Sequence, residues 1–293
     1  MSDIRIITDS ACDIPDDRLA ACPEIVMLNI PMVVDGQPRR ERKDFSIREY
    51  YTVLEQAKEL PTTSQITMME FCEAYKTALE DGVRHLVVVT ITGKASNMYN
   101  SACMARDALW EERPEARGAM TIDVVDSRTY TVLYGTAILE AVDMIRAGAD
   151  YTRVVQHLST IPERVDVSFT IFNLDYAKRS GRISFAAAFV GELLGLRPIM
   201  SIIDGAVAST GKVRGDRQAI QKLVSLYEQA AAGAADYPYI LLQGGRDDYY
   251  EELRQAMLAR KHKNVQGHYY IGASVTTNAG PTLVGVIYPR KKA

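Results

Sequence analysis

The sequence predicts an α/β protein of two domains, with a parallel, doubly wound sheet in the N-terminal domain and a mixed or antiparallel sheet in a C-terminal α+β domain. Short β-branched strands alternate with helical patterns up to about residue 160, which is typical of a doubly wound sheet. Beyond that point a turn at Asp204-Gly205 separates two strand patterns, and such a hairpin requires antiparallel pairing. A chain of 293 residues, 47% of them hydrophobic, can form two cores. We therefore expect domains over residues 1–160 and 161–293.

In the first domain, apolar strands are separated by helical patterns. The predicted strands are Ile4–Thr8, Ile25–Val34 with a break at Pro31, Leu86–Val89 and Met120–Val125. These runs are short and β-branched, as in strands covered on both faces. The predicted helices are Ile14–Cys22, Ser46–Leu60, Thr67–Glu80, Asn97–Leu109 and Tyr134–Ala147. The helix that starts at Ser46 has the clearest signal, because Glu49 follows three residues later as in a capping box.

The second domain contains more strands and the predicted hairpin. Its expected strands are Val167–Ile171, Pro198–Ile203, Ala206–Thr210, Tyr239–Leu242, His268–Ile271 and Leu283–Tyr288. Its expected helices are Leu174–Lys178, Ser184–Leu194, Asp216–Ala232 and Tyr249–Arg260. The turn at Asp204-Gly205 predicts antiparallel pairing of the strands on either side of it.

The turn between the strand Leu86–Val89 and the next helix is rich in hydroxyl groups. Thr90, Thr92 and Ser96 lie in it, and a helix that begins there offers unpaired N–H groups and the positive end of its dipole to an anion. Asp9-Ser10 and Asp126-Ser127 also follow apolar strands, and Thr62–Gln65 forms a neighbouring loop, so a parallel sheet would bring them all to one edge. The alternative is that these residues only cap helices, Ser96 among them. The turn contains no acid or His that could activate a hydroxyl group, which favours binding over catalysis.

Composition excludes several classes of protein. A net charge of −3 and a pI near 5.9 argue against a nucleic-acid-binding surface. The first residues lack the apolar segment of a signal peptide, and no apolar run approaches the roughly 20 residues of a membrane span. The four cysteines are scattered and the histidines have no metal-binding spacing. We expect a cytoplasmic protein with free thiols, no metal and no cofactor.

The sequence resembles the DegV family of bacterial fatty-acid-binding proteins, which includes the FakB subunits of fatty acid kinase. Motifs that match the family run along the whole chain in the family's order: Thr8-Asp9-Ser10, Thr63-Ser64-Gln65, Thr92–Ala102, Asp126-Ser127, Gly181-Arg182-Ile183-Ser184, Arg197-Pro198-Ile199, Asp204-Gly205, Lys212-Val213-Arg214 and Gly280-Pro281. The resemblance implies a two-domain DegV-like fold with a long-chain fatty acid bound in a buried tunnel between the domains.

The resemblance also implies the roles of individual residues. The carboxylate of the fatty acid would be bound by Thr63, Ser96, Asn97, Arg182 and Asn278, and its tail would be lined by Phe185, Phe189, Leu193 and Leu194. The family has Gly at the position of Asn97 and His at that of Asn278, and an Asn side chain can donate to a carboxylate but carries no charge. From the residues alone, the spacing of the Phe and Leu positions favours an ordinary helix core, and the alternative for Arg182 is a surface ion pair.

The resemblance further implies a non-catalytic carrier whose only ligand is the fatty acid. It would present the carboxylate to the catalytic subunit of a fatty acid kinase for phosphorylation, so that the acyl chain can enter phospholipid. Arg214 would help to dock the kinase, although a solvated turn also explains an Arg there. We expect a monomer that contacts membranes transiently and binds no nucleic acid.

Two other functions are compatible with the sequence. The first is a hydrolase or acyltransferase with Ser96 or Ser10 as nucleophile, although no His lies near either serine in the sequence. The second is a lipid-responsive regulator without a kinase partner. Asp9 and Asp126 are interpreted as caps rather than as catalytic acids.

Overall fold

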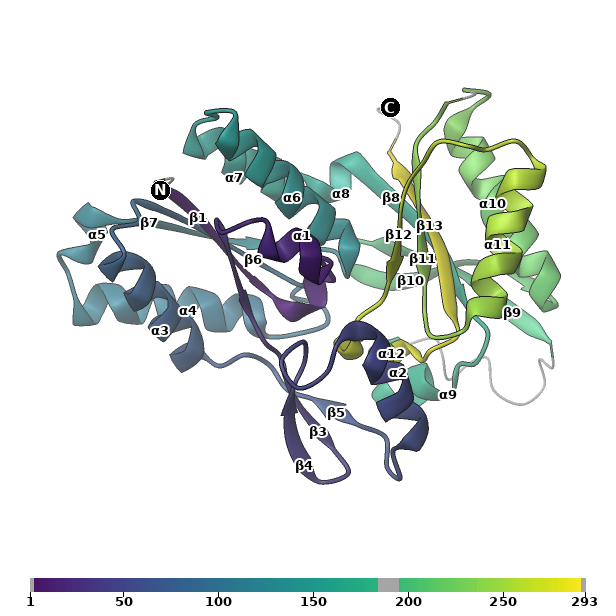
Figure 1. The fold of residues 1–293 in the computed structure, drawn as a ribbon, viewed down its shortest axis with the longest axis horizontal. Helices are drawn as coiled ribbons and strands as arrows, with labels where there is room; N and C mark the ends of the chain where they lie inside the picture. The colour runs from purple at the N-terminus through teal and green to yellow at the C-terminus, as the bar shows by residue number, and fades with distance from the viewer. Residues whose placement is uncertain (1–2, 184–194, 235, 291–293) are drawn as a thin grey trace. The chain divides into compact units, whose positions relative to one another are not determined.

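The computed structural model describes residues 3–183, 195–234 and 236–290. The chain divides into two compact units: Met1–Phe45 with Pro61–Ile161, and Ser46–Leu60 with Pro162–Ala293. The segment Ser46–Leu60, which the sequence prediction assigns to the first domain, therefore belongs with the second unit. Figure 1 shows the secondary structure of both units.

The first unit is built on a four-stranded parallel sheet, as predicted. Its strand order is β2 (Ile25–Leu28), β1 (Ile4–Asp9), β6 (His85–Thr90) and β7 (Thr121–Asp126). The helices are α1 (Asp16–Ala20), α3 (Met68–Glu80), α4 (Met98–Glu112), α5 (Ala116–Ala119), α6 (Val132–Arg146) and α7 (Tyr151–Ser159), and a 3-10 turn, η1, covers Ser10–Cys12. Helices α3 and α4 cover one face of the sheet, and α6 and α7 cover the other (Figure 1). The two central strands, β1 and β6, are thus covered on both faces, which explains their apolar runs. The edge strand β7, which the sequence predicts to be buried, exposes Thr121 and Asp123.

The apolar run Ile25–Val34 forms two strands that belong to different sheets. Strand β2 ends at Leu28, and β3 (Pro31–Val34) starts a small antiparallel sheet with the order β4 (Gln37–Arg40), β3 and β5 (Thr62–Thr63). The hairpin turns at Asp35 and Gly36, both with positive φ. The loop expected at Thr62–Gln65 thus begins as a short strand.

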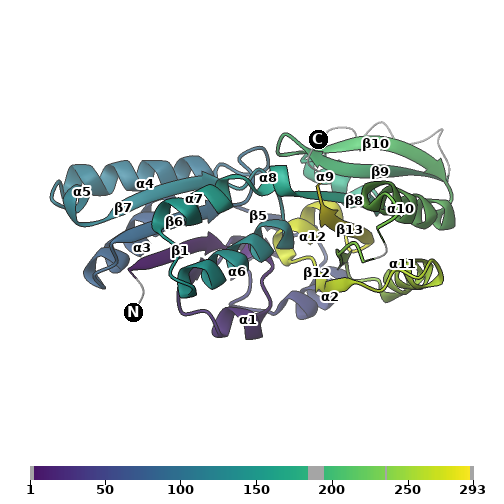
Figure 2. The same cartoon turned by 90° about the horizontal axis from the view of Figure 1, so that it is seen from above.

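The second unit contains a six-stranded mixed sheet. Its order is β10 (Ala206–Arg214), β9 (Leu196–Ile203), β8 (Val165–Ile171), β13 (Leu283–Pro289), β11 (Tyr239–Gln243) and β12 (Val265–Tyr270). All neighbours are antiparallel except β11 and β12, and the hairpin at Asp204-Gly205 is confirmed. Helices α10 (Asp216–Ala231) and α11 (Asp247–Ala259) pack next to each other against the sheet (Figure 2). The helix expected at Ser184–Leu194 lies outside the described residues.

Helix α2 (Ile47–Gln56) joins the second unit through two buried tyrosines. The predicted capping box of Ser46 and Glu49 is present, although the helix ends four residues before Leu60. The Tyr51 hydroxyl donates to the carbonyl of Ile271 at 2.6 Å, and the hydroxyls of Tyr50 and Thr277 form a 2.5 Å hydrogen bond. These contacts reach α12 (Ala273–Ala279), which packs on α9 (Asp175–Ser180). A further short helix, α8 (Ile161–Arg164), precedes β8.

Among the helices that the structure describes, none combines the length and the hydropathy needed to cross a bilayer.

Candidate functional site

The polar residues at the strand ends of the first unit meet at one edge of the parallel sheet, as predicted. The Asp9 carboxylate, at the end of β1, accepts the N–H of Ile91 at 2.8 Å, and that of Asp126, at the end of β7, accepts the N–H of Gly93 at 3.1 Å. The Thr92 N–H donates to the carbonyl of Thr129 at 3.0 Å. The loop between β6 and α4 is therefore held in place by the ends of both neighbouring strands.

Helix α4 begins without a side-chain cap. Asn97 occupies the cap position, but its side-chain amide oxygen accepts from the side-chain amide of Asn100 at 2.6 Å instead of from a backbone N–H. Ser96, the cap residue in the alternative interpretation, lies one residue before the cap position, and its hydroxyl accepts the N–H of Met98 at 3.4 Å. This helix of 15 residues thus begins with no side-chain bond from its cap residue and one long bond from Ser96, and an anion binds readily at such a helix start.

Thr63 belongs to a segment that is tied to the same helix. It pairs with Met32 in the small sheet and is half-buried, whereas its neighbour Thr62 is exposed. Two residues later, the Gln65 side chain donates to the hydroxyl of Ser101 in α4 at 3.1 Å. Thr63, Ser96 and Asn97 therefore all lie on segments attached to the start of α4.

Arg182 and Asn278, both in the second unit, are linked through Ser180. The Ser180 hydroxyl donates to the carbonyl of Asn278 at 3.2 Å and accepts the N–H of Arg182 at 3.3 Å. The Arg182 guanidinium donates to the Ser180 carbonyl, and in the described part of the chain it forms no ion pair. The Asn278 amide donates to the Ser274 carbonyl, one turn earlier in α12, at 2.7 Å. Arg182 is exposed and keeps its charge uncompensated within the described residues.

The remaining predicted residues fall in two places. Phe185, Phe189, Leu193 and Leu194 lie outside the described residues. Arg214 is the last residue of β10 and is exposed, as is Lys212, while Val213 between them packs against the core. This alternation directs the two cations to the same face of the strand.

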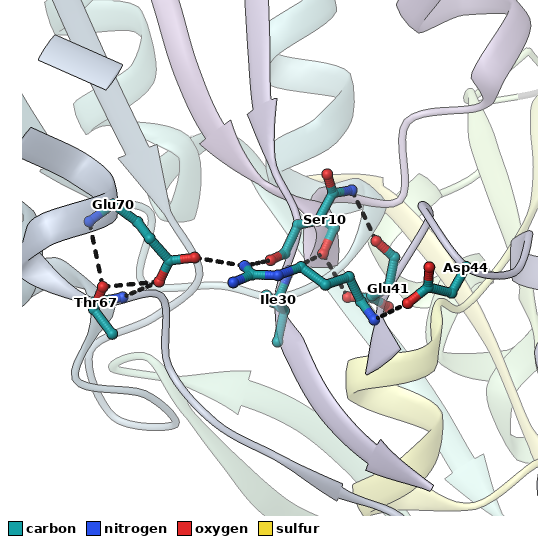
Figure 3. Close-up of polar contacts among 8 residues, drawn as sticks. Ser10, Ile30, Glu41, Asp44, Thr67 and Glu70 are labelled. Atoms are coloured by element: carbon teal, nitrogen blue, oxygen red, sulfur yellow. Dashed lines mark hydrogen bonds and ion pairs between the residues drawn. The ribbon is translucent and has the colours of Figure 1, made fainter. Parts of the chain in front are cut away.

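Ser10, the second candidate nucleophile in the sequence, has a buried side chain that both donates and accepts a hydrogen bond. Its hydroxyl donates to the Glu41 carboxylate at 2.7 Å and accepts the N–H of Ile30 at 3.0 Å, and both Ser10 and Glu41 are almost completely buried (Figure 3). This arrangement joins η1 to the small sheet. Within the described residues, Ser96 has no hydrogen bond to a His, Asp or Glu side chain.

Metal binding has no support in the side chains that the structure describes. No three His, Cys, Asp or Glu residues among them lie close enough together to hold an ion.

Asp9 has a larger role than the cap that sequence reasoning assigns to it. It is completely buried and accepts hydrogen bonds from Ile91, Ala11 and the Tyr134 hydroxyl. Burial raises the pKa of its carboxyl from 3.8 to about 6, and the three donors offset only part of this effect. Only its position in Thr8-Asp9-Ser10, directly after a buried strand, could have drawn attention to it.

This raised pKa predicts that Asp9 makes the protein less stable as the pH rises. Between 3.8 and about 6 the unfolded chain loses the proton while the folded chain keeps it. The stabilising contribution is therefore complete below a pH of about 4 and is lost as the pH rises through about 6. We expect the free energy of unfolding of the wild type to fall by about 1 kcal/mol relative to Asp9→Asn between about pH 5 and about pH 7.5, in urea titrations. A constant difference between the two proteins over this range would contradict the prediction.

Comparison with known proteins identifies the fold and the family. Residues 3–291 match the family described as "Uncharacterised protein, DegV family". A DegV domain-containing protein of Deinococcus radiodurans is 32% identical over 287 residues, which cover 97% of each chain. The structure of a DegV family protein from Thermus thermophilus, described as binding a fatty acid, is 27% identical with a TM-score of 0.84 and covers 99% of this chain and 100% of its own. The structure of a DegV lipid-binding protein from Thermotoga maritima is 26% identical with a TM-score of 0.80, and it also covers 99% of this chain and 100% of its own. The chain therefore belongs to the DegV family.

Proposed function

We propose that this protein binds a long-chain fatty acid and presents its carboxylate to the catalytic subunit of a fatty acid kinase, without catalysing a reaction itself. The observation that carries the proposal is the start of α4, whose cap residue Asn97 bonds to no backbone N–H, with Ser96 directly before it and the Thr63 segment tied to the same helix. The Thermus thermophilus relative, described as binding a fatty acid, supports the same ligand.

The chemistry of a fatty acid fits these groups. Burial of about 15 methylenes at about 0.8 kcal/mol each favours complete enclosure of the tail. The carboxylate opposes burial, because an ion that leaves water costs several kcal/mol unless it is hydrogen-bonded. Hydroxyl groups and the N–H groups of an uncapped helix lower that cost. We propose that Thr63, Ser96 and Asn97 of the first unit and Arg182 and Asn278 of the second bind the carboxylate.

Mass spectrometry of the purified protein tests the ligand. The protein is expressed, purified without detergent, denatured and extracted with organic solvent, and the extract is analysed for fatty acids against a calibrated standard. We expect about one fatty acid per chain. A protein that is empty and also fails to take up added palmitate or oleate would contradict the proposal.

The docking role of Arg214 is a separate prediction. Because Arg214 is exposed and has no ionic partner within the described residues, Arg214→Glu places a negative charge on this face without affecting the core. We expect at least about a tenfold loss of kinase-dependent acyl-phosphate formation, with the amount of bound fatty acid unchanged. The control is Arg153→Glu, an exposed position on α7 in the first unit. Full phosphate transfer by Arg214→Glu would contradict docking through this residue, and the absence of transfer by the wild type would favour a lipid-responsive regulator.

A further inference from the structure

A groove in the first unit runs along the outer edge of the parallel sheet. It has a volume of about 730 Å³ and lies between β2 and one face of α3, where Met69, Glu70, Glu73, Ala74 and Thr77 line it. On the β2 side it is lined by four consecutive residues, Val26–Asn29. Side chains of a strand alternate between its two faces, so four consecutive residues border one groove only where it follows the edge of the strand.

The backbone at this edge has hydrogen-bonding groups that the sheet does not use. The Ile6 N–H donates to the Glu24 carbonyl at 2.9 Å, and the β1 partner of Met27 is Thr8. In this parallel register, Val26 and Leu28 bond to β1, and Met27 points both its N–H and its carbonyl away from β1. Among the residues that the structure describes, none bonds to these two groups. Because β2 is the last strand of its sheet, they face the groove.

The side chains around the groove define what it can bind. Met69 is 73% exposed on the α3 wall, a large apolar surface for a single residue. Three cations and two acids line the groove. Arg5 pairs with Asp81, Arg40 with Glu70 and the exposed Glu73 with Lys76 at 3.9 Å, whereas Lys43 is exposed and has no ionic partner in the described ranges. The groove thus offers a strand edge, an apolar contact and one unused positive charge.

We propose that this groove binds an extended, acidic peptide segment of a partner protein, which adds to β2 as a fifth strand of the sheet. Strand addition satisfies the main-chain groups of Met27, and an acidic side chain of the peptide pairs with Lys43. A single strand needs only about 4.8 Å of width beside β2. This binding is independent of the fatty acid.

A peptide selection followed by affinity measurements tests the proposal. Random heptapeptides displayed on phage are selected on the wild type after depletion on Met27→Pro, which removes the Met27 side chain and the one N–H of β2 that points away from β1 at this position. The enriched peptides are synthesised with a fluorescein label, and their affinities are measured by fluorescence anisotropy. We expect acidic peptides whose affinity falls at least about tenfold for Met27→Pro and several-fold for Lys43→Glu. Met27→Ala, the matched control, keeps the N–H and should stay within about threefold of the wild type.

A second measurement avoids any variant that could perturb folding. The enriched peptide is synthesised with methyl groups on alternate backbone nitrogens, in the two possible registers, and tested on the wild type. One register should bind and the other should not, because only alternate N–H groups of an added strand face β2. Equal binding of both registers, equal affinity for Met27→Pro, or no enriched peptide would overturn the proposal. A concentration-dependent dimer in light scattering that Met27→Pro abolishes would assign the edge to a second copy instead.

Discussion

Replacement of both Thr63 and Ser96 by alanine is expected to leave the protein without its fatty acid. If each hydroxyl donates to the carboxylate, each hydrogen bond to the charged group contributes about 1.5–3 kcal/mol. Loss of both therefore weakens binding by about 100-fold or more. Neither change affects a core contact, since both side chains are only half-buried and the Ser96 hydroxyl meets the Met98 N–H at a long 3.4 Å. The measurement is the amount of fatty acid per chain after solvent extraction.

The chain offers a matched control for this double substitution. Thr62 is the exposed neighbour of Thr63 in β5 and pairs with Val33, which is itself exposed, and Ser209 is an exposed serine of β10. The variant with Thr62→Ala and Ser209→Ala removes the same two kinds of hydroxyl from surface positions, and it should keep the wild-type amount of lipid. Equal retention by both double variants would show that Thr63 and Ser96 do not bind the carboxylate.

The first sheet was predictable because its signals are local. Its central strands β1 and β6 are mostly apolar, and the start of α3 is visible as Thr67 with Glu70 three residues later. The meeting of the strand ends at one edge followed from the parallel order alone. The sequence could not show that the carboxylates of Asp9 and Asp126 would accept hydrogen bonds from two backbone N–H groups of the loop between β6 and α4. Such contacts join segments far apart in the chain.

The elements that were misassigned or missed depend on distant partners. The amphipathic pattern of α2 shows which face is buried but not against what, and its tyrosine hydroxyls find their partners at Ile271 and Thr277. Helix α12 shows no helical period of apolar residues in the sequence. Its buried positions include Thr276 and Thr277, whose hydroxyls donate to the carbonyls of residues five and four positions earlier. Polar side chains that satisfy themselves locally resemble a loop in the sequence.

The substitution Gly135→Ala is expected to destabilise the first unit severely. Gly135 lies in α6, and a Cβ there would be 2.1 Å from the carbonyl oxygen of Cys12 and 3.1 Å from the Ile14 side chain. The carbonyl is backbone and cannot rotate away, so α6 and η1 must separate. We expect the free energy of unfolding to fall by about 3 kcal/mol or more, measured by urea titration. The control is Gly118→Ala on α5, where a Cβ meets no atom within 4 Å.

This prediction also connects the stability of α6 with the site. The residue before Gly135 is Tyr134, whose hydroxyl donates to the Asp9 carboxylate at 2.7 Å. The same carboxylate accepts the N–H of Ile91, at the start of the loop between β6 and α4. A shift of α6 away from η1 therefore moves the carboxylate that positions this loop. At a temperature where Gly135→Ala is still folded, we expect it to retain less fatty acid than Gly118→Ala, which should match the wild type or be stabilised by up to about 1 kcal/mol. If Gly135→Ala were as stable as Gly118→Ala and retained as much lipid, then the packing of α6 on η1 would not support the loop, and its position would depend on the contacts of Asp126 and Thr129.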